Sequence, residues 1–159
     1  MNKFLAALTM GIALLNADSL KIDSPLKMLE SFRYETPAGR QIKIPQKIEL
    51  VIVAFEKDTG ALVNEYLDTQ SPFYLQKSNS IFIADINKMP TVIANMFALP
   101  KLQKYKHLIY LHYGEKLQAV VPNKEQKVTL LYIEDSKIKE ISFISTHKEL
   151  KMAIEKRYR

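Results

Sequence analysis

The sequence predicts a single α/β domain with a central mixed sheet, an N-terminal β-hairpin and flanking helices. Residues 48–55, IELVIVAF, form the richest run of β-branched residues, and a continuous apolar run is typical of a central strand covered on both faces. Shorter apolar runs at residues 80–86 and 107–113 predict a second and a third strand, with helical patterns between the strands. Alternating patterns over residues 32–44 and 127–144 predict hairpins at the two ends.

The first central strand leads into a helix through a short polar turn. Residues 56–60, EKDTG, follow the strand, and either Asp58 or Thr59 is a candidate N-cap. The apolar residues after them recur at a spacing that places them on one helical face: Leu62, Val63, Tyr66 and Leu67. The pattern therefore predicts a strand–turn–helix unit.

The two predicted hairpins have recognisable turns. In the first, residues 36–39, TPAG, supply a proline with a preset φ and a glycine free to adopt positive φ. In the second, residues 134–136, EDS, separate two apolar strands. Thr146 and Glu149 then form a capping-box pattern, which predicts a closing amphipathic helix. Its apolar residues are Leu150 and Ile154, with Ala153 and Met152 as weaker members.

A second helix is expected to begin at Met89-Pro90, since proline is tolerated in a first turn, and to end or kink at Pro100. Ile93, Met96, Phe97 and Pro100 share one face of it. For Met96 and Phe97 we expect a core role, with a docking surface as the alternative. Residues 71–79 and 114–127 are predicted as connections, the latter with a short apolar stretch at 117–121.

The N-terminus has the pattern of a cleaved signal peptide. Lys3 precedes a 12-residue apolar stretch, and Ala17 offers the small residue that signal peptidase requires. The stretch is too short to span a bilayer. The alternative interpretation is a buried N-terminal helix of a cytosolic protein, but the stretch is apolar on all sides and lacks the polar face that a helix at the protein surface has. We therefore divide the chain into a signal peptide (1–17), a leader (18–31) and a domain (32–159), exported to the periplasm or secreted without a stable membrane anchor.

Composition excludes several classes of function. The chain contains no cysteine, so thiol nucleophiles, CxxC redox motifs and cysteine metal sites are impossible. Its formal net charge of +6 is moderate, and no run of five or more basic residues marks a nucleic-acid surface. We therefore expect no nucleic-acid partner.

Candidate catalytic residues are few. His107 and His112 lie five residues apart on a predicted strand, hence on opposite faces, which argues against a shared metal. Asp85 follows a strand and could face a cleft, although no partner carboxylate is identifiable. Residues 58–60 precede a helix and could present N–H groups to an anion, but capping is the favoured role of Asp58 and Thr59. We predict no catalytic residue, metal or cofactor.

The order of elements resembles the thioredoxin-like superfamily, and more narrowly a branch exported by bacteria. The resemblance covers residues 32–157 and is carried by FRYETPAGRQIKI, IELVIVAFEKDTGALVNEYL and KVTLLYIEDSKIKEISFISTHKELKMAIE. In that superfamily a CxxC motif occupies the turn after the first central strand, which here is residues 57–61, KDTGA. A cis-proline precedes the last hairpin in the family, whereas residues 125–129 here contain no proline. The resemblance therefore implies the fold and not redox activity.

Two functions from different classes follow. The first is an exported, non-redox module that binds a periplasmic protein partner or a ligand where the redox site would have been. Its candidate binding face comprises Lys57, Asp58, Thr59, Gly60, Lys104 and Tyr105. The alternative is an enzyme or cofactor-binding protein whose site is assembled from residues scattered along the chain. A structural component of the cell envelope is a third interpretation.

Overall fold

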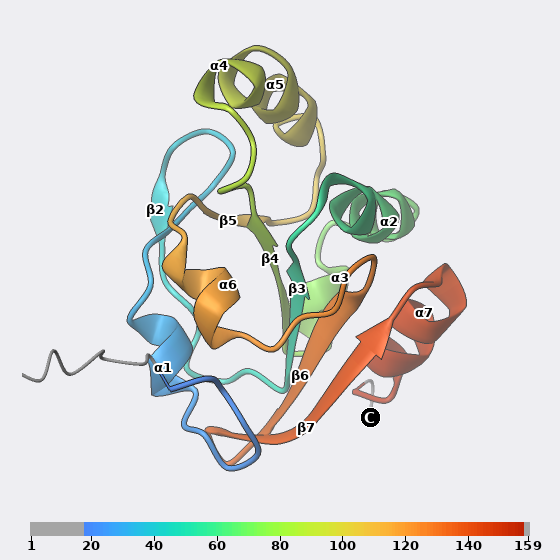
Figure 1. Cartoon of the computed structure of the whole chain (residues 1–159). Helices are drawn as coiled ribbons and strands as arrows, with labels where there is room; N and C mark the ends of the chain where they lie inside the picture. Colours follow the sequence, from blue (N-terminus) through green and yellow to red (C-terminus); the bar gives the residue numbers. More distant parts are fainter. Residues whose placement is uncertain (1–17, 158–159) are drawn as a thin grey trace, which may run out of the picture.

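A computed structural model describes residues 18–157, so the predicted signal peptide lies outside the described residues. Seven strands form one mixed sheet in the order β2-β1-β5-β4-β3-β6-β7 (Figure 1). The strands are β1 (Tyr34–Glu35), β2 (Gln41–Ile42), β3 (Leu50–Ala54), β4 (Ser80–Asp85), β5 (Tyr110–His112), β6 (Val128–Glu134) and β7 (Lys137–Ile144). The α/β class and the mixed sheet predicted from the sequence are confirmed.

The helices are short except for the second and the last. They are α1 (Lys27–Glu30), α2 (Lys57–Asp68), α3 (Tyr74–Lys77), α4 (Thr91–Ile93), the π-helical turn η1 (Ala94–Ala98), α5 (Leu99–Leu102), α6 (Lys116–Val120) and α7 (His147–Glu155). Among residues 18–157, none of these helices is long and apolar enough to cross a membrane.

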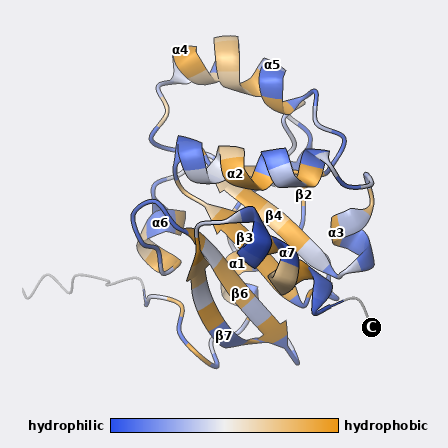
Figure 2. Ribbon diagram, turned by 90° about the vertical axis from the view of Figure 1, so that its right-hand side faces the viewer, coloured by the Kyte–Doolittle hydropathy of each residue, from blue (hydrophilic) through white to orange (hydrophobic). Residues whose placement is uncertain are grey.

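Strand β3 lies at the centre of the sheet and is buried along its whole length. It pairs in parallel with β4 and antiparallel with β6, and β4 pairs in parallel with β5. Because side chains alternate across a sheet, Leu50 and Ile52 face one core and Val51 and Val53 face the other. The central strands are accordingly the most hydrophobic part of the ribbon (Figure 2).

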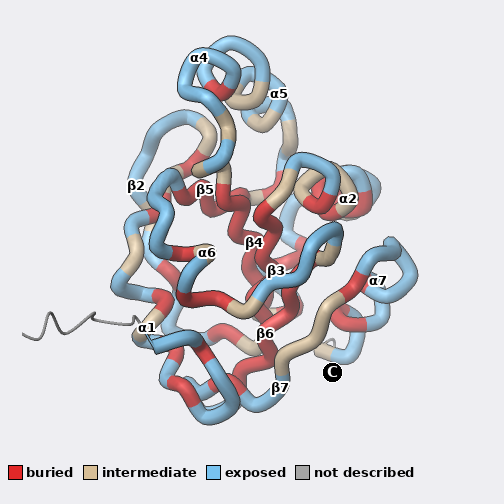
Figure 3. Tube along the Cα trace, in the orientation of Figure 1, coloured by how far each residue is buried: buried red, intermediate tan, exposed pale blue. Residues whose placement is uncertain are grey.

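Each core is closed by its own helices. The first contains Val63 and Leu67 of α2, Leu75 of α3 and Leu150 of α7. The second contains Leu29 of α1 and two α6 side chains, Leu117 and Val120. Burial follows the strands and the inner sides of these helices, whereas the stretch from α4 to α5 is largely exposed (Figure 3).

The segment predicted as a leader, residues 18–31, contributes to the second core. Leu20, Leu26 and Leu29 are buried there, and α1 lies within the segment. The backbone N–H of Leu20 donates to the carbonyl of Val120 at 2.8 Å. Asp23 pairs with Lys139 of β7 at 3.0 Å. These residues are therefore folded together with the rest of the domain.

Both predicted hairpins form, the first with strands shorter than its pattern. Gly39 has φ +81° in the first turn, and Asp135 and Ser136 adopt φ of +50° and +59° in the second. The predicted capping box of the closing helix is also present. Glu149 N–H donates to Thr146 Oγ1 at 3.2 Å, while the Glu149 carboxylate accepts from Thr146 N–H at 3.1 Å.

Four expectations need correction. The connections at 71–79 and 114–127 contain α3 and α6, because their few apolar side chains cover the ends of the two cores. The N-cap of α2 is Glu56, neither Asp58 nor Thr59, so this helix begins earlier than predicted. Met152 is exposed, whereas Ala153 belongs to the core face of α7.

Candidate functional site

The turn after β3 is where the resemblance places a redox motif, and here it is closed by polar contacts within the chain. Glu56 and Thr59 form a capping box, in which Thr59 Oγ1 accepts from the Glu56 N–H at 3.2 Å. The Glu56 carboxylate also accepts from the backbone N–H of Gln126, at 3.1 Å to Oε1, in the loop before β6. The first turn of α2 is thus tied to that loop.

This arrangement argues against the anion-binding interpretation of residues 58–60. A helix N-terminus attracts anions because its first N–H groups lack partners, but Glu56 already places a carboxylate there. Thr59 is buried, and its hydroxyl also bonds the Glu56 carbonyl at 3.0 Å. Lys57 and Asp58 remain exposed. The charged groups that this turn exposes to solvent are therefore the ammonium of Lys57 and the carboxylate of Asp58.

A groove of about 470 Å³ lies between α2 and the start of α7. Asp58 is the member of the predicted face that lines it, together with residues of both helices: Ala61, Leu62, Glu65, Ser145, Thr146 and His147. The ring of His147 lies 6.0 Å from that of Tyr66, centroid to centroid. The groove is thus lined by the carboxylates of Asp58 and Glu65 and by two small apolar contributions, from Ala61 and Leu62.

Lys104 and Tyr105 lie toward the other end of α2. The half-buried Tyr105 ring lies 5.1 Å from the ring of His107. Its pKa is raised by burial and then by the charges of Asp68 and Glu65, which belong to the later turns of α2. A helix of twelve residues is about 18 Å long, so the predicted face consists of two groups of residues along α2.

His107 lies behind Tyr105 and makes a buried polar contact with α2. Its Nε2 lies 2.8 Å from the Oδ1 of Asn64, which is also buried. Burial lowers the pKa of His107 to about 4, against a smaller opposing effect of Asp68. The imidazole is therefore neutral at pH 7, and its Nε2–H donates to Asn64.

A second buried polar pair, which sequence reasoning did not identify, joins β4 and β5. Asp85 and His112 are register partners at the carboxyl ends of these adjacent parallel strands. Asp85 Oδ1 accepts from Asn87 N–H at 2.9 Å, and His112 Nδ1 contacts the Arg33 carbonyl at 3.0 Å. Asp85 Oδ2 and His112 Nε2 are buried without a hydrogen-bond partner.

The surroundings of this pair explain its electrostatics. Burial raises the pKa of Asp85, while the Asn87 N–H and the neighbouring His112 act in the opposite direction. The rings of Phe32 and Tyr34 lie 5.5 and 5.9 Å from that of His112. The signal in the sequence was a polar residue at the end of each of two adjacent parallel strands, where open α/β sheets hold ligands.

His107 and His112 therefore have different partners, one on α2 and the other at the N-terminal hairpin. Within residues 18–157 there is no group of three or more His, Asp or Glu side chains placed to hold a metal ion. The same range contains no cis peptide bond, and Gln126, in the loop where the family has its proline, has φ +58°.

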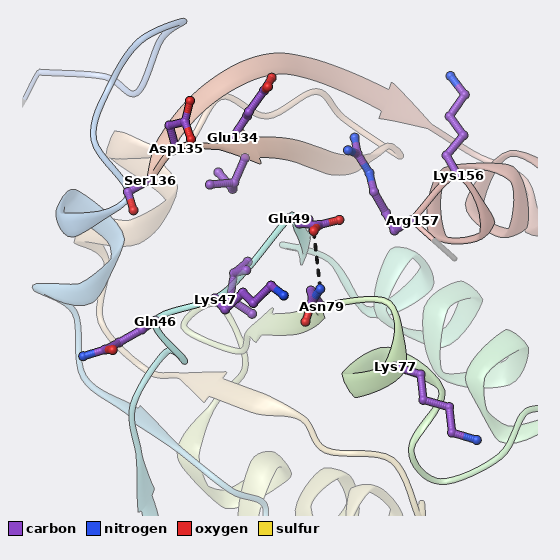
Figure 4. A pocket seen from close by; sticks show the side chains of 12 residues that line it. Gln46, Lys47, Glu49, Lys77, Asn79, Glu134, Asp135, Ser136, Lys156 and Arg157 are labelled. Atoms are coloured by element: carbon purple, nitrogen blue, oxygen red, sulfur yellow. Dashed lines mark hydrogen bonds between the residues drawn. The ribbon is translucent and has the colours of Figure 1, made fainter. Parts of the chain in front are cut away.

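The larger groove, about 1010 Å³, lies at the opposite end of the sheet, where β3 begins (Figure 4). Glu49 and Asn79 lie side by side in it, with Asn79 Nδ2 donating to Glu49 Oε1 at 3.4 Å. Charges of both signs surround them, namely Lys47, Lys77, Glu134, Asp135, Lys156 and Arg157. None of the predicted site residues lines this groove.

The stretch from α4 to α5 overturns one further expectation. Met96 and Phe97, expected in the core, are each 64% exposed. Ala94, Leu99 and Leu102 face inward in their place. The π-helical turn η1 shifts the rotation of the helix, and Pro100 is accommodated at the start of α5 without ending it. The apolar stripe read from the sequence is the outer face.

Comparisons with known proteins identify similarity only at the level of structure. No protein-family model matches the chain, and no curated protein matches its sequence. A SCO1/SenC family lipoprotein from Bacillus anthracis has a TM-score of 0.53 and 11% identity, covering 91% of this chain and 97% of its own. Peroxiredoxin Q from Xanthomonas campestris has a TM-score of 0.53 and 10% identity, covering 89% and 97%.

A third structure, an uncharacterised thioredoxin-like protein from Porphyromonas gingivalis, has a TM-score of 0.50 and 10% identity over 80% of this chain and 90% of its own. At such identities the similarity concerns the fold alone. The chain therefore has the thioredoxin-like fold, which confirms the resemblance predicted from its sequence.

Proposed function

We propose that this chain is an exported, non-redox thioredoxin-like protein that binds a protein partner along the exposed side of α2. The observation that carries the proposal is the turn at residues 56–61. It occupies the position of a redox motif, contains no thiol, and is closed by the Glu56 cap. The turn still exposes Lys57 and Asp58 although it has no redox group, so it can serve as a surface that binds another molecule.

The side chains available there suit a peptide or protein surface. Asp58, Glu65 and Asp68 are exposed on α2, with Lys57 at its start and Lys104 near its end. The half-buried Leu62 lies between the charged groups in the groove beside α7. An apolar area inside a polar, solvent-accessible rim is the general arrangement of a protein interface.

Site-specific photo-crosslinking in the producing cells tests this proposal. A photoreactive residue replaces Asp58, Glu65 or Lys104 in turn, and Glu140 on the outer strand β7 serves as the control position. We expect the same discrete adduct from the three positions near α2 and none from the control. Adducts from all four positions, or from none, would contradict a binding face on α2.

Charge reversal provides the second measurement. Lys57→Glu combined with Asp58→Lys preserves the net charge and alters only exposed side chains, so the fold should be unchanged by circular dichroism. We expect the adduct formed at position 104 to decrease at least tenfold. The matched control exchanges Lys137 and Glu140 on β7 in the same way and should leave the adduct unchanged.

The buried Asp85–His112 pair favours a second candidate, a small-molecule or enzymatic site that needs no thiol. Two unpaired polar atoms at the carboxyl ends of parallel strands are the specific observation. NMR fragment screening tests it. A compound that shifts the His112 ring resonances of the wild type, and binds neither His112→Gln nor Asp85→Asn, would support this site. A screen whose hits cluster only at α2 would argue against it.

A further inference from the structure

The segment from α4 through η1 to α5, residues 91–102, stands apart from the rest of the molecule. It projects beyond the end of the sheet above α2 and is attached through Ala94, Leu99 and Leu102 (Figures 1 and 2). Its two flanks are anchored by the polar contacts described above, Asp85 to Asn87 before it and His107 to Asn64 after it. The segment therefore lies between two polar contacts that flank it.

Its outer face is apolar. Val92, Met96 and Phe97 are 64–65% exposed, and Ile93 is 45% exposed. Spacings of one, four and five residues place the four side chains on one side of the helical segment. They make up half of the large hydrophobic residues that are exposed within residues 18–157. A contiguous group of exposed apolar side chains of this kind is typical of an interaction surface.

The charged side chains within this part of the sequence are all basic. Residues 86–114 contain four lysines and no aspartate or glutamate, although the whole chain has 17 acidic residues. All four lysines are exposed: Lys88, Lys101, Lys104 and Lys106. None of them takes part in the ion pairs found within residues 18–157. The segment that carries the apolar face is therefore basic, while acidic groups of neighbouring elements, Asp85 near Lys88 and Asp68 near Tyr105, adjoin its two flanks.

We propose that residues 88–106 dock on an anionic lipid surface, with Phe97 and Met96 entering the boundary between headgroups and acyl chains. Aromatic and aliphatic side chains flanked by lysines are the features of helices that lie in a membrane interface. Each lysine close to phosphate groups adds electrostatic attraction. The contact is reversible and peripheral, and its apolar part, Met96 and Phe97, contains no residue of the proposed protein interface on α2, although the two surfaces adjoin at Lys104.

The other occupants fit less well. In a symmetric dimer, four lysines of each copy would face those of the other, and four side chains offer far less than the roughly 800 Å² per partner of a stable interface. A protein partner would need an acidic groove shaped to this projecting helix. Neither groove described above includes a residue of this segment. A lipid surface requires no matched shape.

Vesicle co-sedimentation tests the proposal with the full chain. The probes are vesicles of phosphatidylglycerol mixed with phosphatidylcholine, and vesicles of phosphatidylcholine alone. We expect binding to the first kind, at least tenfold weaker binding to the second, and loss of binding in 0.5 M salt. Every variant carries the same N-terminal region, so any contribution of that region cancels in the comparison.

The decisive variant is Met96→Ser combined with Phe97→Ser, which alters exposed side chains and should keep the wild-type unfolding temperature. Its matched control is Phe73→Ser combined with Met152→Ser, which removes side chains that are 65% and 56% exposed elsewhere. We expect the first variant to lose at least tenfold in affinity for the anionic vesicles and the control to bind like the wild type. Lys88→Gln with Lys101→Gln should weaken binding, whereas Lys43→Gln with Lys47→Gln should not.

Three outcomes would overturn the proposal. The first is no binding to anionic vesicles beyond that to neutral ones. The second is equal binding by the Met96/Phe97 variant and the wild type. The third is a photo-crosslink from position 96 to a protein, or to a second copy of this chain, without vesicle binding, which would assign the face to a protein. Each can occur whether or not the α2 face binds its partner.

Discussion

The imidazole of His107 donates a hydrogen bond of 2.8 Å to the side-chain oxygen of Asn64, which joins α2 to the segment before β5. Both residues are buried, and the pKa of His107 is lowered to about 4 because burial disfavours the charged ring. The contact fixes the position of Tyr105 and Lys104 relative to α2. It also makes the stability of the domain dependent on pH.

The pH dependence follows from the direction of the shift. The unfolded chain binds a proton with a pKa near 6.5, whereas the folded chain does so only near 4. Folding stability from this group is complete above about pH 6.5 and decreases as the pH falls to about 4, by up to roughly 3 kcal/mol at 1.36 kcal/mol per pKa unit. Urea unfolding at pH 7 and pH 4.5 should show the loss. His107→Gln should flatten it, and the exposed His147→Gln should not.

The raised pKa of Asp85 predicts a pH dependence of folding stability opposite to that caused by His107. Burial raises the pKa of this carboxyl, so its folded form retains a proton that the unfolded form has lost. Its contribution to stability is therefore largest in acid and decreases as the pH rises through the unfolded and then the folded pKa. Asp85→Asn keeps an oxygen for the Asn87 N–H and removes the charge. We expect the free energy of unfolding to increase by about 1 kcal/mol at pH 7 and by nothing at pH 3.

Glu65→Gln is the control for that measurement, because Glu65 is exposed in the middle of α2 and its replacement should change the free energy of unfolding by less than about 0.5 kcal/mol. A loss of stability in Asp85→Asn at pH 7 would show that the ionised carboxylate has a favourable partner in solution.

The cap of α2 gives a third prediction. Glu56 bonds both to the first turn of α2 and to Gln126, so Glu56→Ala removes two backbone contacts at once. Loss of a cap costs about 0.5–2 kcal/mol, so we expect a decrease in this range by chemical denaturation. Glu65→Ala, on the exposed side of the same helix, is the comparison. Equal effects of the two replacements would refute the role of Glu56 as the cap.

The exposure of Phe97 can be tested by stability alone. Phe97→Ala should change the free energy of unfolding by less than about 0.5 kcal/mol, as is usual for surface sites. Phe82→Ala, at a fully buried position of β4, should cost about 3–5 kcal/mol. A cost of 2 kcal/mol or more at Phe97 would mean that the side chain is covered in the free protein.

Export remains a prediction from the sequence, and cell fractionation with mass spectrometry tests it. We expect the protein in the periplasmic fraction with Asp18 as its first residue, since Ala17 precedes the expected cut. Ala17→Lys should block cleavage and leave the longer chain in the membrane fraction. A full-length chain in the cytoplasmic fraction of the wild type would refute the signal peptide.

Local patterns were sufficient for most elements of the fold. The apolar run at 48–55 became the central strand, the turn at 134–136 formed a hairpin, and Thr146 with Glu149 capped the last helix. These succeed because each depends on residues within a few positions of one another. The short helices α3 and α6 were missed because their stability comes from contact with the cores rather than from their own sequence.

The candidate site was less predictable. The stripe containing Met96 and Phe97 was correctly placed on one helical face, but periodicity alone does not say whether that face meets the core or solvent. Ala94 and Leu102 pack toward the rest of the domain, and this contact turns the face with Met96 and Phe97 toward solvent. The pairing of Asp85 with His112, 27 residues apart, required the register of β4 against β5.

By itself the sequence determined that no thiol chemistry is possible and that a strand–turn–helix unit lies at the centre of the fold. Both follow from residue identity and short-range spacing. Only the tertiary structure decided that the turn is closed by Glu56 and Gln126, that two polar atoms remain unpaired beneath the N-terminal hairpin, and that an apolar helical face is turned outward. These depend on contacts between segments distant in the chain, and local patterns contain no information about which segments meet.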